Sequence, residues 1–234
     1  MNLRKYLKVY KKFLHTSLAS ELEYKTNILV DLITAILSLI GSIFLLSIFF
    51  QNNGYIGGWK FEQALIIQAI YTILNGITNT WFNPNLTEIV KHIREGTLDF
   101  VLLKPIDSQF FISLKKINPS GFLEIMLGFF LLLFCIRINQ INLSLSFLSL
   151  SLITISCSIC ILYSLWFFIS TTTIWFVKTW NAIEVLRSFL YIGRFPLNSF
   201  SFSLRVFFSI ITVSYTHLRA HETDSYLVCR LLLE

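Results

Sequence analysis

The chain has 234 residues, of which 55% are hydrophobic and only 14% charged, and its net charge is +6. A water-soluble domain carries about 25% charged residues, whereas here apolar runs recur that approach the ~20 residues needed to cross a bilayer. The composition therefore excludes a soluble globular protein and predicts an all-α polytopic membrane protein. The cations lie beside the apolar runs, which is typical of a membrane orientation signal and argues against nucleic acid as a partner.

The first predicted element is an amphipathic helix over residues 3–16. Apolar residues recur along it at helical spacing, and cations occupy the opposite side. These cations are Arg4, Lys5, Lys8, Lys11 and Lys12. A surface helix of a soluble domain would show the same pattern, but the neighbouring membrane span favours a helix that lies at the membrane surface. We therefore interpret the five cations as anchors to an anionic bilayer.

Five membrane spans are expected in chain order. They run from about Asn27 to Phe50, from Phe61 to Phe82, from Gly121 to Ile136, up to about Val177, and up to about Pro196. Four polar residues near the end of the second span, Asn75, Thr78, Asn79 and Thr80, are expected to bond neighbouring helices or to line a hydrated cleft.

The distribution of cations predicts the orientation. Residues 1–26 hold six Lys and Arg residues and residues 83–118 hold five, whereas the loops 51–60 and 137–143 hold one each. The positive-inside rule then places the N-terminus and the 83–118 segment in the cytoplasm, and the membrane that we expect is a bacterial plasma (inner) membrane. An even number of spans would return the chain to the cytoplasm, so we expect a sixth span that this sequence lacks.

A long polar segment, residues 83–118, separates the second and third spans. Asn85 is expected to cap a new helix, with Glu88 three positions later returning the bond. Leu86, Ile89, Val90 and Ile93 give this helix an apolar face. Gly96 suits its C-terminal stop, and Pro105 disfavours helix at the residue before it.

Residues 213–234, VSYTHLRAHETDSYLVCRLLLE, differ from the rest of the chain. They resemble the in-frame translation of a transposon-type sequencing-library adapter. We therefore divide the chain into a native part, residues 1–212, and a non-native tail, residues 213–234, which would explain the missing sixth span. His217 and His221 have the spacing of metal ligands on a helix, as Cys157 and Cys160 have that of a CxxC motif, but we expect no metal site.

The stretch IREGTLDFVLLKPIDSQF, residues 93–110, carries a family resemblance. It fits the pattern I-R-x-G-x-L-D-x-x-L-L-x-P-I, which follows the second span in daunorubicin-resistance-like permeases. The matching residues are Ile93, Arg94, Gly96, Leu98, Asp99, Leu102, Leu103, Pro105 and Ile106. Residues 1–212 thus resemble the permease subunits of ABC-2 type exporters, apart from the absent sixth span.

The resemblance implies ATP-driven export in which a separate nucleotide-binding subunit binds ATP and Mg, so no cofactor is expected on this chain. The 83–118 segment would be a coupling helix that docks on that subunit, and a second permease subunit, identical or related, would complete the transporter. The sequence agrees, because it contains no G-x-x-x-x-G-K-[ST] phosphate loop and no catalytic set. We therefore expect a transport subunit and not an enzyme.

The expected docking surface combines an apolar ridge, charges that set register and specificity, and two residues that bend the chain. The apolar ridge consists of Ile89, Val90, Ile93 and Leu98. The charged residues are Arg94, Glu95, Asp99 and Lys104. Gly96 and Pro105 bend the chain. The alternative is a solvated loop that merely links two spans, and such a loop needs none of these features.

Two other functions remain open. A secondary transporter would use intramembrane carboxylates or broken helices, and the cores of these spans contain almost no ionisable residues. A membrane scaffold that transports nothing can be separated from a permease only by a partner or transport assay.

Overall fold

The computed structural model describes residues 3–23, 25–51, 55–56, 58–140, 144–175, 186–188, 190–191 and 193–195. The helices are α1 (Leu3–Glu23), α2 (Lys25–Gln51), α3 (Phe61–Ile77), the π-helix η1 (Thr78–Phe82), α4 (Asn83–Arg94), α5 (Leu98–Leu102), α6 (Ser108–Leu114), α7 (Ser120–Ile138) and α8 (Leu145–Thr172). Strands β1 (Tyr55–Ile56) and β2 (Trp59–Lys60) pair antiparallel. Most of the expected fifth span, the apolar run from Val206 and the tail 213–234 lie outside the described residues.

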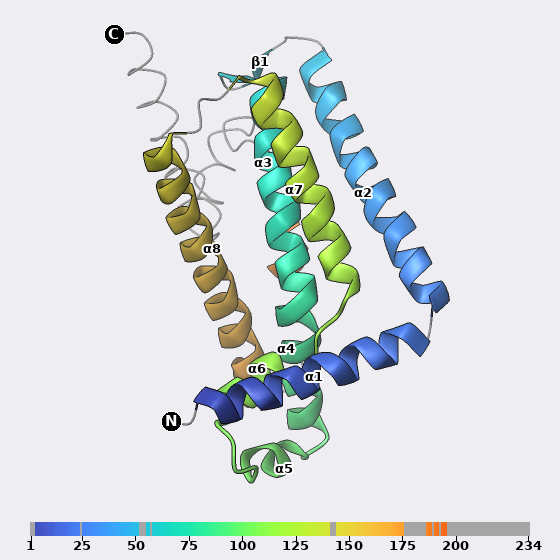
Figure 1. Cartoon of the computed structure of the whole chain (residues 1–234), viewed down its shortest axis with the longest axis vertical. Coiled ribbons are helices and arrows are strands. Elements are labelled where there is room, and N and C mark those ends of the chain that lie inside the picture. The colour runs from blue at the N-terminus through green and yellow to red at the C-terminus, as the bar shows by residue number, and fades with distance from the viewer. Residues whose placement is uncertain are drawn as a thin grey trace.

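Three helices in the described part of the chain are long and apolar enough to cross a membrane: Thr26–Gln51, Ser120–Ile138 and Leu145–Thr172. They correspond to the expected first, third and fourth spans. The expected second span is helical throughout as α3 and η1, although α3 alone has 17 residues. In Figure 1, α3 lies beside α7, while α2 diverges from both toward its residue-25 end.

Small residues allow α3 and α7 to approach closely. A Cβ atom on Gly76 would lie 2.8 Å from the backbone nitrogen of Ile125, and one on Gly128 would lie 2.9 Å from that of Ile73. Real Cβ atoms do not come so close to backbone, so glycine is required at both positions. Small residues bring helices together in the same way in other membrane proteins, where close packing replaces the hydrophobic driving force.

The helix does not break between the membrane and the polar segment. η1 links α3 to α4, and the backbone N–H of Asn83 bonds the carbonyl of Thr78, five residues earlier. Pro84 has no N–H and so leaves the carbonyl of Thr80 without its helical partner. That carbonyl accepts instead from the N–H of Asn118, at 3.0 Å. The proline thus creates a backbone link between the start of α4 and the residues before α7.

Two apolar clusters hold the helices together. One joins α2, α3 and α7 and consists of Leu46, Phe50, Ala64, Leu65, Ala69, Leu131 and Cys135. The other joins α4 to α8 and consists of Leu86, Ile89, Val90, Trp166 and Leu186. The second cluster lies where the polar segment leaves the spans, so it sets the position of α4.

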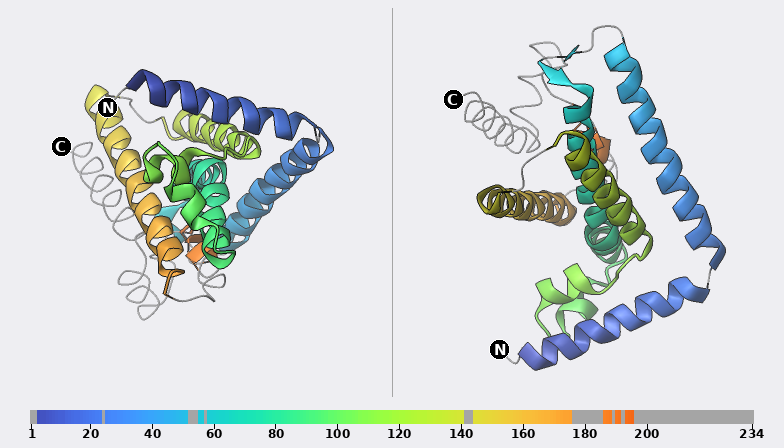
Figure 2. Two further views of the ribbon diagram at one scale, coloured as in Figure 1. Left: turned by 90° about the horizontal axis from the view of Figure 1, so that it is seen from below. Right: turned by 45° about the horizontal axis from the view of Figure 1, so that its top comes forward.

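The helix α1 crosses the end of the molecule at which α4, α5 and α6 gather, and it runs across the direction of the spans (Figures 1 and 2). Helix α1 is therefore present as expected, but it extends to Glu23, well beyond residue 16. Its aromatic side chains contact other helices of this chain. The ring of Tyr6 packs edge-on against Phe110 and that of Phe13 against Phe111.

Candidate docking surface

The end of α4 has the geometry that the sequence predicts. Gly96 has φ = 67°, a conformation that glycine adopts without steric cost. The N–H of Thr97 bonds the carbonyl of His92 at 2.9 Å, and the N–H of Gly96 bonds that of Ile93 at 3.3 Å. This bond pair defines a Schellman motif. The predicted stop at Gly96 is confirmed.

The predicted start of this helix at Asn85 is wrong. Asn85 lies inside the continuous helix and is buried. Its amide nitrogen donates to the carbonyl oxygens of Trp81 and Lys116, at 2.7 and 2.6 Å, and its amide oxygen accepts from the N–H of Lys116, at 2.8 Å. Asn85 therefore joins α4 to the chain that leads into α7, and it does not cap a helix.

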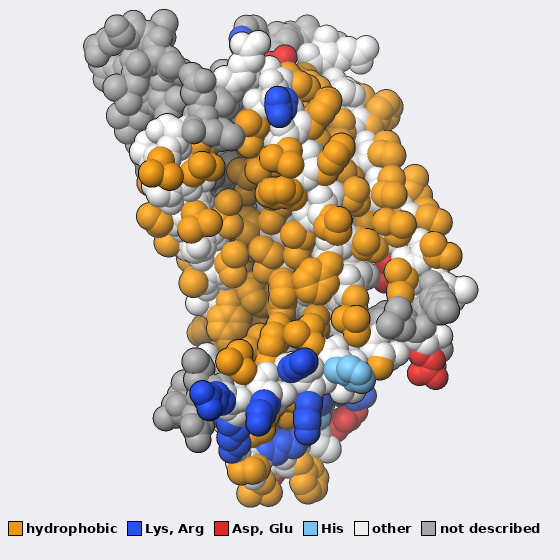
Figure 3. Space-filling model, viewed as in Figure 1, with side chains coloured by type: hydrophobic (Ala, Val, Ile, Leu, Met, Phe, Trp, Pro, Cys, Tyr) orange, Lys and Arg blue, Asp and Glu red, His pale blue; other side chains and the backbone are white. Residues whose placement is uncertain are grey.

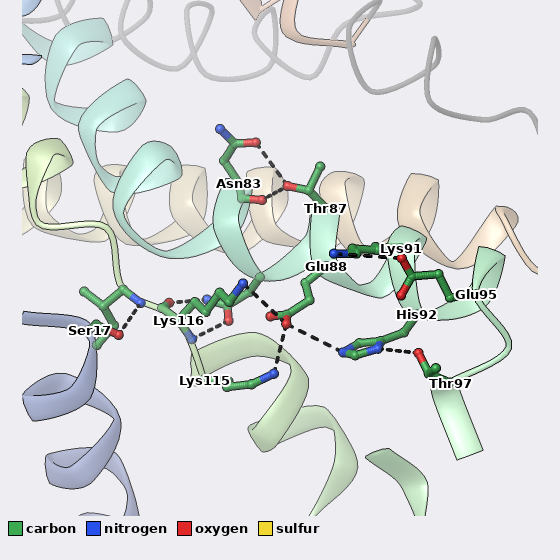
Figure 4. Close-up of polar contacts among 12 residues, drawn as sticks. Ser17, Asn83, Thr87, Glu88, Lys91, His92, Glu95, Thr97, Lys115 and Lys116 are labelled. Atoms are coloured by element: carbon green, nitrogen blue, oxygen red, sulfur yellow. Dashed lines mark hydrogen bonds and ion pairs between the residues drawn. The ribbon is translucent and has the colours of Figure 1, made fainter. Parts of the chain in front are cut away.

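Glu88 is the centre of a polar network on the inner side of the segment (Figure 4). Its carboxylate accepts from the ammonium of Lys115 at 2.9 Å, and the ammonium of Lys116 lies 3.4 Å away. His92 Nε2 lies 3.7 Å from the same oxygen, and His92 Nδ1 lies 2.8 Å from the Thr97 hydroxyl. The network thus connects α4, its C-terminal turn and the end of α6.

Opposing effects act on the pKa of Glu88. Partial burial favours the neutral acid and would raise the pKa, but the hydrogen bond and charge of Lys115, together with Lys116, stabilise the carboxylate. The net result is a pKa below the ordinary value, so Glu88 is ionised at neutral pH. The sequence predicts Glu88 only as part of a helix cap, and no local pattern indicates its lysine partners.

The residues expected to form the apolar ridge are largely covered by the chain itself. Ile89 and Val90 are 5% and 1% exposed and belong to the cluster with Leu86 and Trp166. Ile93 packs against the same cluster and is half-buried, as is Leu98. In this conformation Ile89 and Val90 hold α4 in place and offer no free surface to a partner.

A different apolar surface is exposed on the short helix α5 and the turn after it. Phe100, Leu102 and Leu103 are 70%, 53% and 79% exposed, and we call these three residues the α5 tip. Val101 between them is buried and points back to the segment. Leu102 and Leu103 belong to the family pattern of the sequence, but nothing local marked them or Phe100 as exposed.

The expected charged and bending residues lie close to the α5 tip in the sequence. Six of them are exposed: Arg94, Glu95, Gly96, Asp99, Lys104 and Pro105. The Lys104 ammonium lies 4.0 Å from the centre of the Phe111 ring, which turns this side chain back toward α6. Asp107 caps α6 by accepting from the N–H of Phe110 at 2.8 Å.

The N-terminal helix α1 forms hydrogen bonds with the 83–118 segment and with η1. Lys5 Nζ donates to the carbonyl of Pro105 at 3.2 Å, the N–H of Asp107 donates to the Tyr6 hydroxyl at 3.4 Å, and Trp81 Nε1 donates to the Tyr10 hydroxyl at 3.3 Å. The cations expected to anchor the chain are all exposed: Arg4, Lys5, Lys8, Lys11 and Lys12. Figure 3 shows basic side chains gathered at this end, below a surface that is almost entirely hydrophobic.

Within the spans, the polar residues expected to bond a neighbouring helix do so in two cases. Asn75 and Asn79 donate to the carboxylate of Glu124 on α7, at 2.8 Å and at 3.0–3.1 Å. Thr78 and Thr80 bond carbonyls of their own helix.

Comparison with known proteins adds the family. Residues 36–216 match the family model described as "ABC-2 family transporter protein". No curated protein and no solved structure matches the chain. The matched range covers more than half of the chain and includes the whole 83–118 segment. The chain therefore belongs to the ABC-2 transporter family, as a multi-pass membrane permease component.

Proposed function

We propose that this chain is the membrane-spanning subunit of an ATP-driven exporter in the bacterial plasma membrane, in the branch of daunorubicin-resistance-like permeases. A separate nucleotide-binding subunit would bind ATP and Mg and dock on the 83–118 segment. A second permease subunit, identical or related, would complete the transport path. Family membership supports the division between permease and ATPase.

The observation that carries the proposal is the exposed α5 tip. Three exposed apolar side chains lie at the end of the molecule that carries the basic residues, and the exposed charged residues Arg94, Asp99 and Lys104 lie near them in the chain. An apolar centre with a charged rim is the usual anatomy of a protein interface. We assign the contact with the ATPase to the α5 tip and its rim, and we assign to Ile89 and Val90 the support of α4.

The connection to the membrane supports a coupling role. The helix runs without a break from Phe61 to Arg94 through α3, η1 and α4. A displacement of the α5 tip would therefore move α4 and α3 together. The bond between Thr80 and Asn118 would pass the same displacement to α7. A flexible linker would absorb such a movement, whereas this segment transmits it.

The proposal counts α3 and η1 as the second span. Phe61–Phe82 has 22 residues, which gives a helix of about 33 Å, enough for a hydrocarbon core of about 30 Å. With the fifth span expected before Pro196, five spans would lie on this chain. The N-terminus and the α5 tip would then lie in the cytoplasm.

The test is the association with an ATPase. The chain is co-expressed with ABC-type ATPase subunits encoded in the same genome and purified through a tag on the permease. Leu103→Asp places a charge at the centre of the α5 tip, and we expect it to reduce co-purification of the ATPase about tenfold, as loss of an interface hot spot does. Asp99→Arg should weaken the complex through the rim.

The matched control is Leu145→Asp at the start of α8. Leu145 is 84% exposed, much like Leu103, but it lies at the opposite end of the molecule. We expect this variant to co-purify with the ATPase as the wild type does. If Leu103→Asp retains the ATPase as well as Leu145→Asp does, the α5 tip is not the docking site.

A further inference from the structure

One arginine is buried between the spans. Arg194 is only 4% exposed, and its guanidinium reaches α2 and α3. Nη1 donates to the hydroxyl of Ser42 at 2.6 Å. The guanidinium carbon lies 3.3 Å from the ring centre of Tyr191 and 5.0 Å from that of Tyr71. All three partners are neutral, so none of them balances the positive charge.

Among the residues that the structure describes, Arg194 has no direct counter-ion. Within the described part of the chain, no carboxylate forms an ion pair with it, and its Nε–H has no hydrogen-bond partner. Glu124 on α7 forms no ion pair with Arg194 and instead accepts from the amides of Asn75 and Asn79. An unpaired buried charge is costly in a protein interior and more so in a membrane. The charge left unbalanced among the described residues favours an anion at this position.

The position of Arg194 along the spans is close to the middle of the bilayer. Ser42 precedes the end of α2 at Gln51, and Tyr71 follows the start of α3 at Phe61. At about 1.5 Å per residue these separations are about 14 and 15 Å, half of a hydrocarbon core of about 30 Å. An isolated inorganic anion would reach this depth at a high desolvation cost, so an anionic headgroup on an apolar molecule fits the position better.

Ser42, whose hydroxyl Arg194 contacts, lies at the edge of the packed part of α2. Ser42 is the first buried side chain of α2, since no described α2 residue before it is buried. Over that part α2 diverges from α3 and α7, as two views show (Figures 1 and 2). Arg194 thus lies where the packed part of α2 begins, and the apolar cluster of Leu46 and Phe50 closes the far side.

We infer that Arg194 recognises the anionic headgroup, phosphate or carboxylate, of an amphiphilic substrate. The planar guanidinium presents paired N–H donors that match such a group, with Nε and one terminal nitrogen on the same edge. Tyr71 and Tyr191 hold the plane of the guanidinium in place. This inference rests on the proposed exporter function and names its substrate class.

The test uses the full chain in nanodiscs of neutral phosphatidylcholine, with dodecyl phosphate as the probe. Its affinity and its effect on the thermal unfolding midpoint are measured beside those of dodecyltrimethylammonium, dodecyl maltoside and inorganic phosphate. We expect only dodecyl phosphate to raise the midpoint of the wild type. Arg194→Gln should lower its affinity about tenfold or more, the effect of losing hydrogen bonds to a charged group.

Two variants separate recognition from general charge and from folding. Arg137→Gln removes an exposed arginine at the end of α7 and should bind dodecyl phosphate as the wild type does. Arg194→Lys keeps the buried charge but loses the paired donors, so it should fold and bind less tightly than the wild type. A merely structural arginine would give a lower midpoint in Arg194→Gln without probe and an unchanged affinity.

Equal affinity in the wild type, Arg194→Gln and Arg194→Lys overturns the inference, as does equal stabilisation by dodecyltrimethylammonium. If inorganic phosphate binds as well as dodecyl phosphate, the assignment to an amphiphile is wrong. The binding measurement needs no ATPase, so its outcome is independent of docking. Leu103→Asp should still bind dodecyl phosphate, and Arg194→Gln should still co-purify with the ATPase.

Discussion

Glu88 organises the polar segment through electrostatics that depend on pH. Its carboxylate holds Lys115 and Lys116 against α4, and its pKa lies below the ordinary 4.5 because these partners outweigh the effect of burial. A carboxylate whose pKa is lower in the folded state binds protons less readily than in the unfolded chain. Its contribution to stability is therefore complete above about pH 4.5 and disappears as the pH falls through the folded-state pKa.

Glu88→Gln should lower the free energy of unfolding at pH 7 by about 1–2 kcal/mol, because a charge-assisted hydrogen bond is lost and Lys115 is left without its partner. The difference from the wild type should shrink as the pH falls well below 4.5. Thermal unfolding in nanodiscs at pH 7 and near pH 3.5 measures both effects.

Glu95→Gln is the matched control for this change. Glu95 pairs with Lys91 at 3.8 Å on the exposed side of α4, where 52% of its side chain is accessible, compared with 17% for Glu88. Exposed pairs of this kind contribute about 0.3–0.5 kcal/mol. If the two variants lose equal stability, Glu88 has no special role.

Local sequence patterns predicted the role of Gly96 correctly but did not predict the partners of Asn85 and Glu88. The stop at Gly96 follows from a requirement of the backbone at that position, so the sequence alone revealed it. Asn85 and Glu88 have the spacing of a capping box, but their partners are Lys115 and Lys116, about 30 residues later. The competition between a local cap and a distant partner is settled only by the packing of α4 against α6, which no local pattern encodes.

At the scale of elements, the helices themselves were predictable and their faces were not. The predicted first, third and fourth spans fall within a few residues of α2, α7 and α8. The apolar side of α4 was also recognised, because period alone identifies it. The helical spacing of the apolar residues does not reveal what packs against them. Here α8 covers Ile89 and Val90. The apolar surface that the 83–118 segment exposes is therefore the α5 tip.

The contact between α3 and α7 makes a prediction of its own. A Cβ atom on Gly121 would lie 2.7 Å from the backbone nitrogen of Thr80 and 2.8 Å from the carbonyl oxygen of Gly76. Gly121→Ala should force the helices apart and lower the free energy of unfolding by about 1–3 kcal/mol, the usual effect of overpacking. Denaturation in mixed detergent micelles, followed by tryptophan fluorescence, measures this change.

Gly41→Ala serves as the control because Gly41 also lies within a membrane helix, and a Cβ atom there would meet nothing within 4 Å. Alanine in the middle of a helix is favoured over glycine by about 0.5–1 kcal/mol, so this variant should be as stable as the wild type or slightly more stable. Equal stability of Gly121→Ala and Gly41→Ala would show that α3 and α7 separate without cost.

At the scale of the whole molecule, the fold brings together cations that are far apart in the sequence. The exposed cations of α1 and those of α4 and the turn after α5 lie at one end, beside the α5 tip (Figure 3). Lys60 and Arg137 mark the other end, before α3 and at the end of α7. The cation-rich segments of the sequence thus lie at one end of the molecule, and the cations of the two short loops lie at the other.

This arrangement predicts which end faces the cytoplasm. The positive-inside rule orients the basic end inward, so Lys91→Cys should be shielded in intact cells from a membrane-impermeant maleimide and Lys60→Cys should react. Both positions are exposed lysines in the described structure, so accessibility of the side chain does not bias the comparison. The labelling is measured in a background from which all four cysteines of the chain have been removed, before and after the membrane is permeabilised. Reaction of Lys91→Cys in intact cells, with Lys60→Cys protected, would place the α5 tip outside, where no cytoplasmic ATPase could reach it.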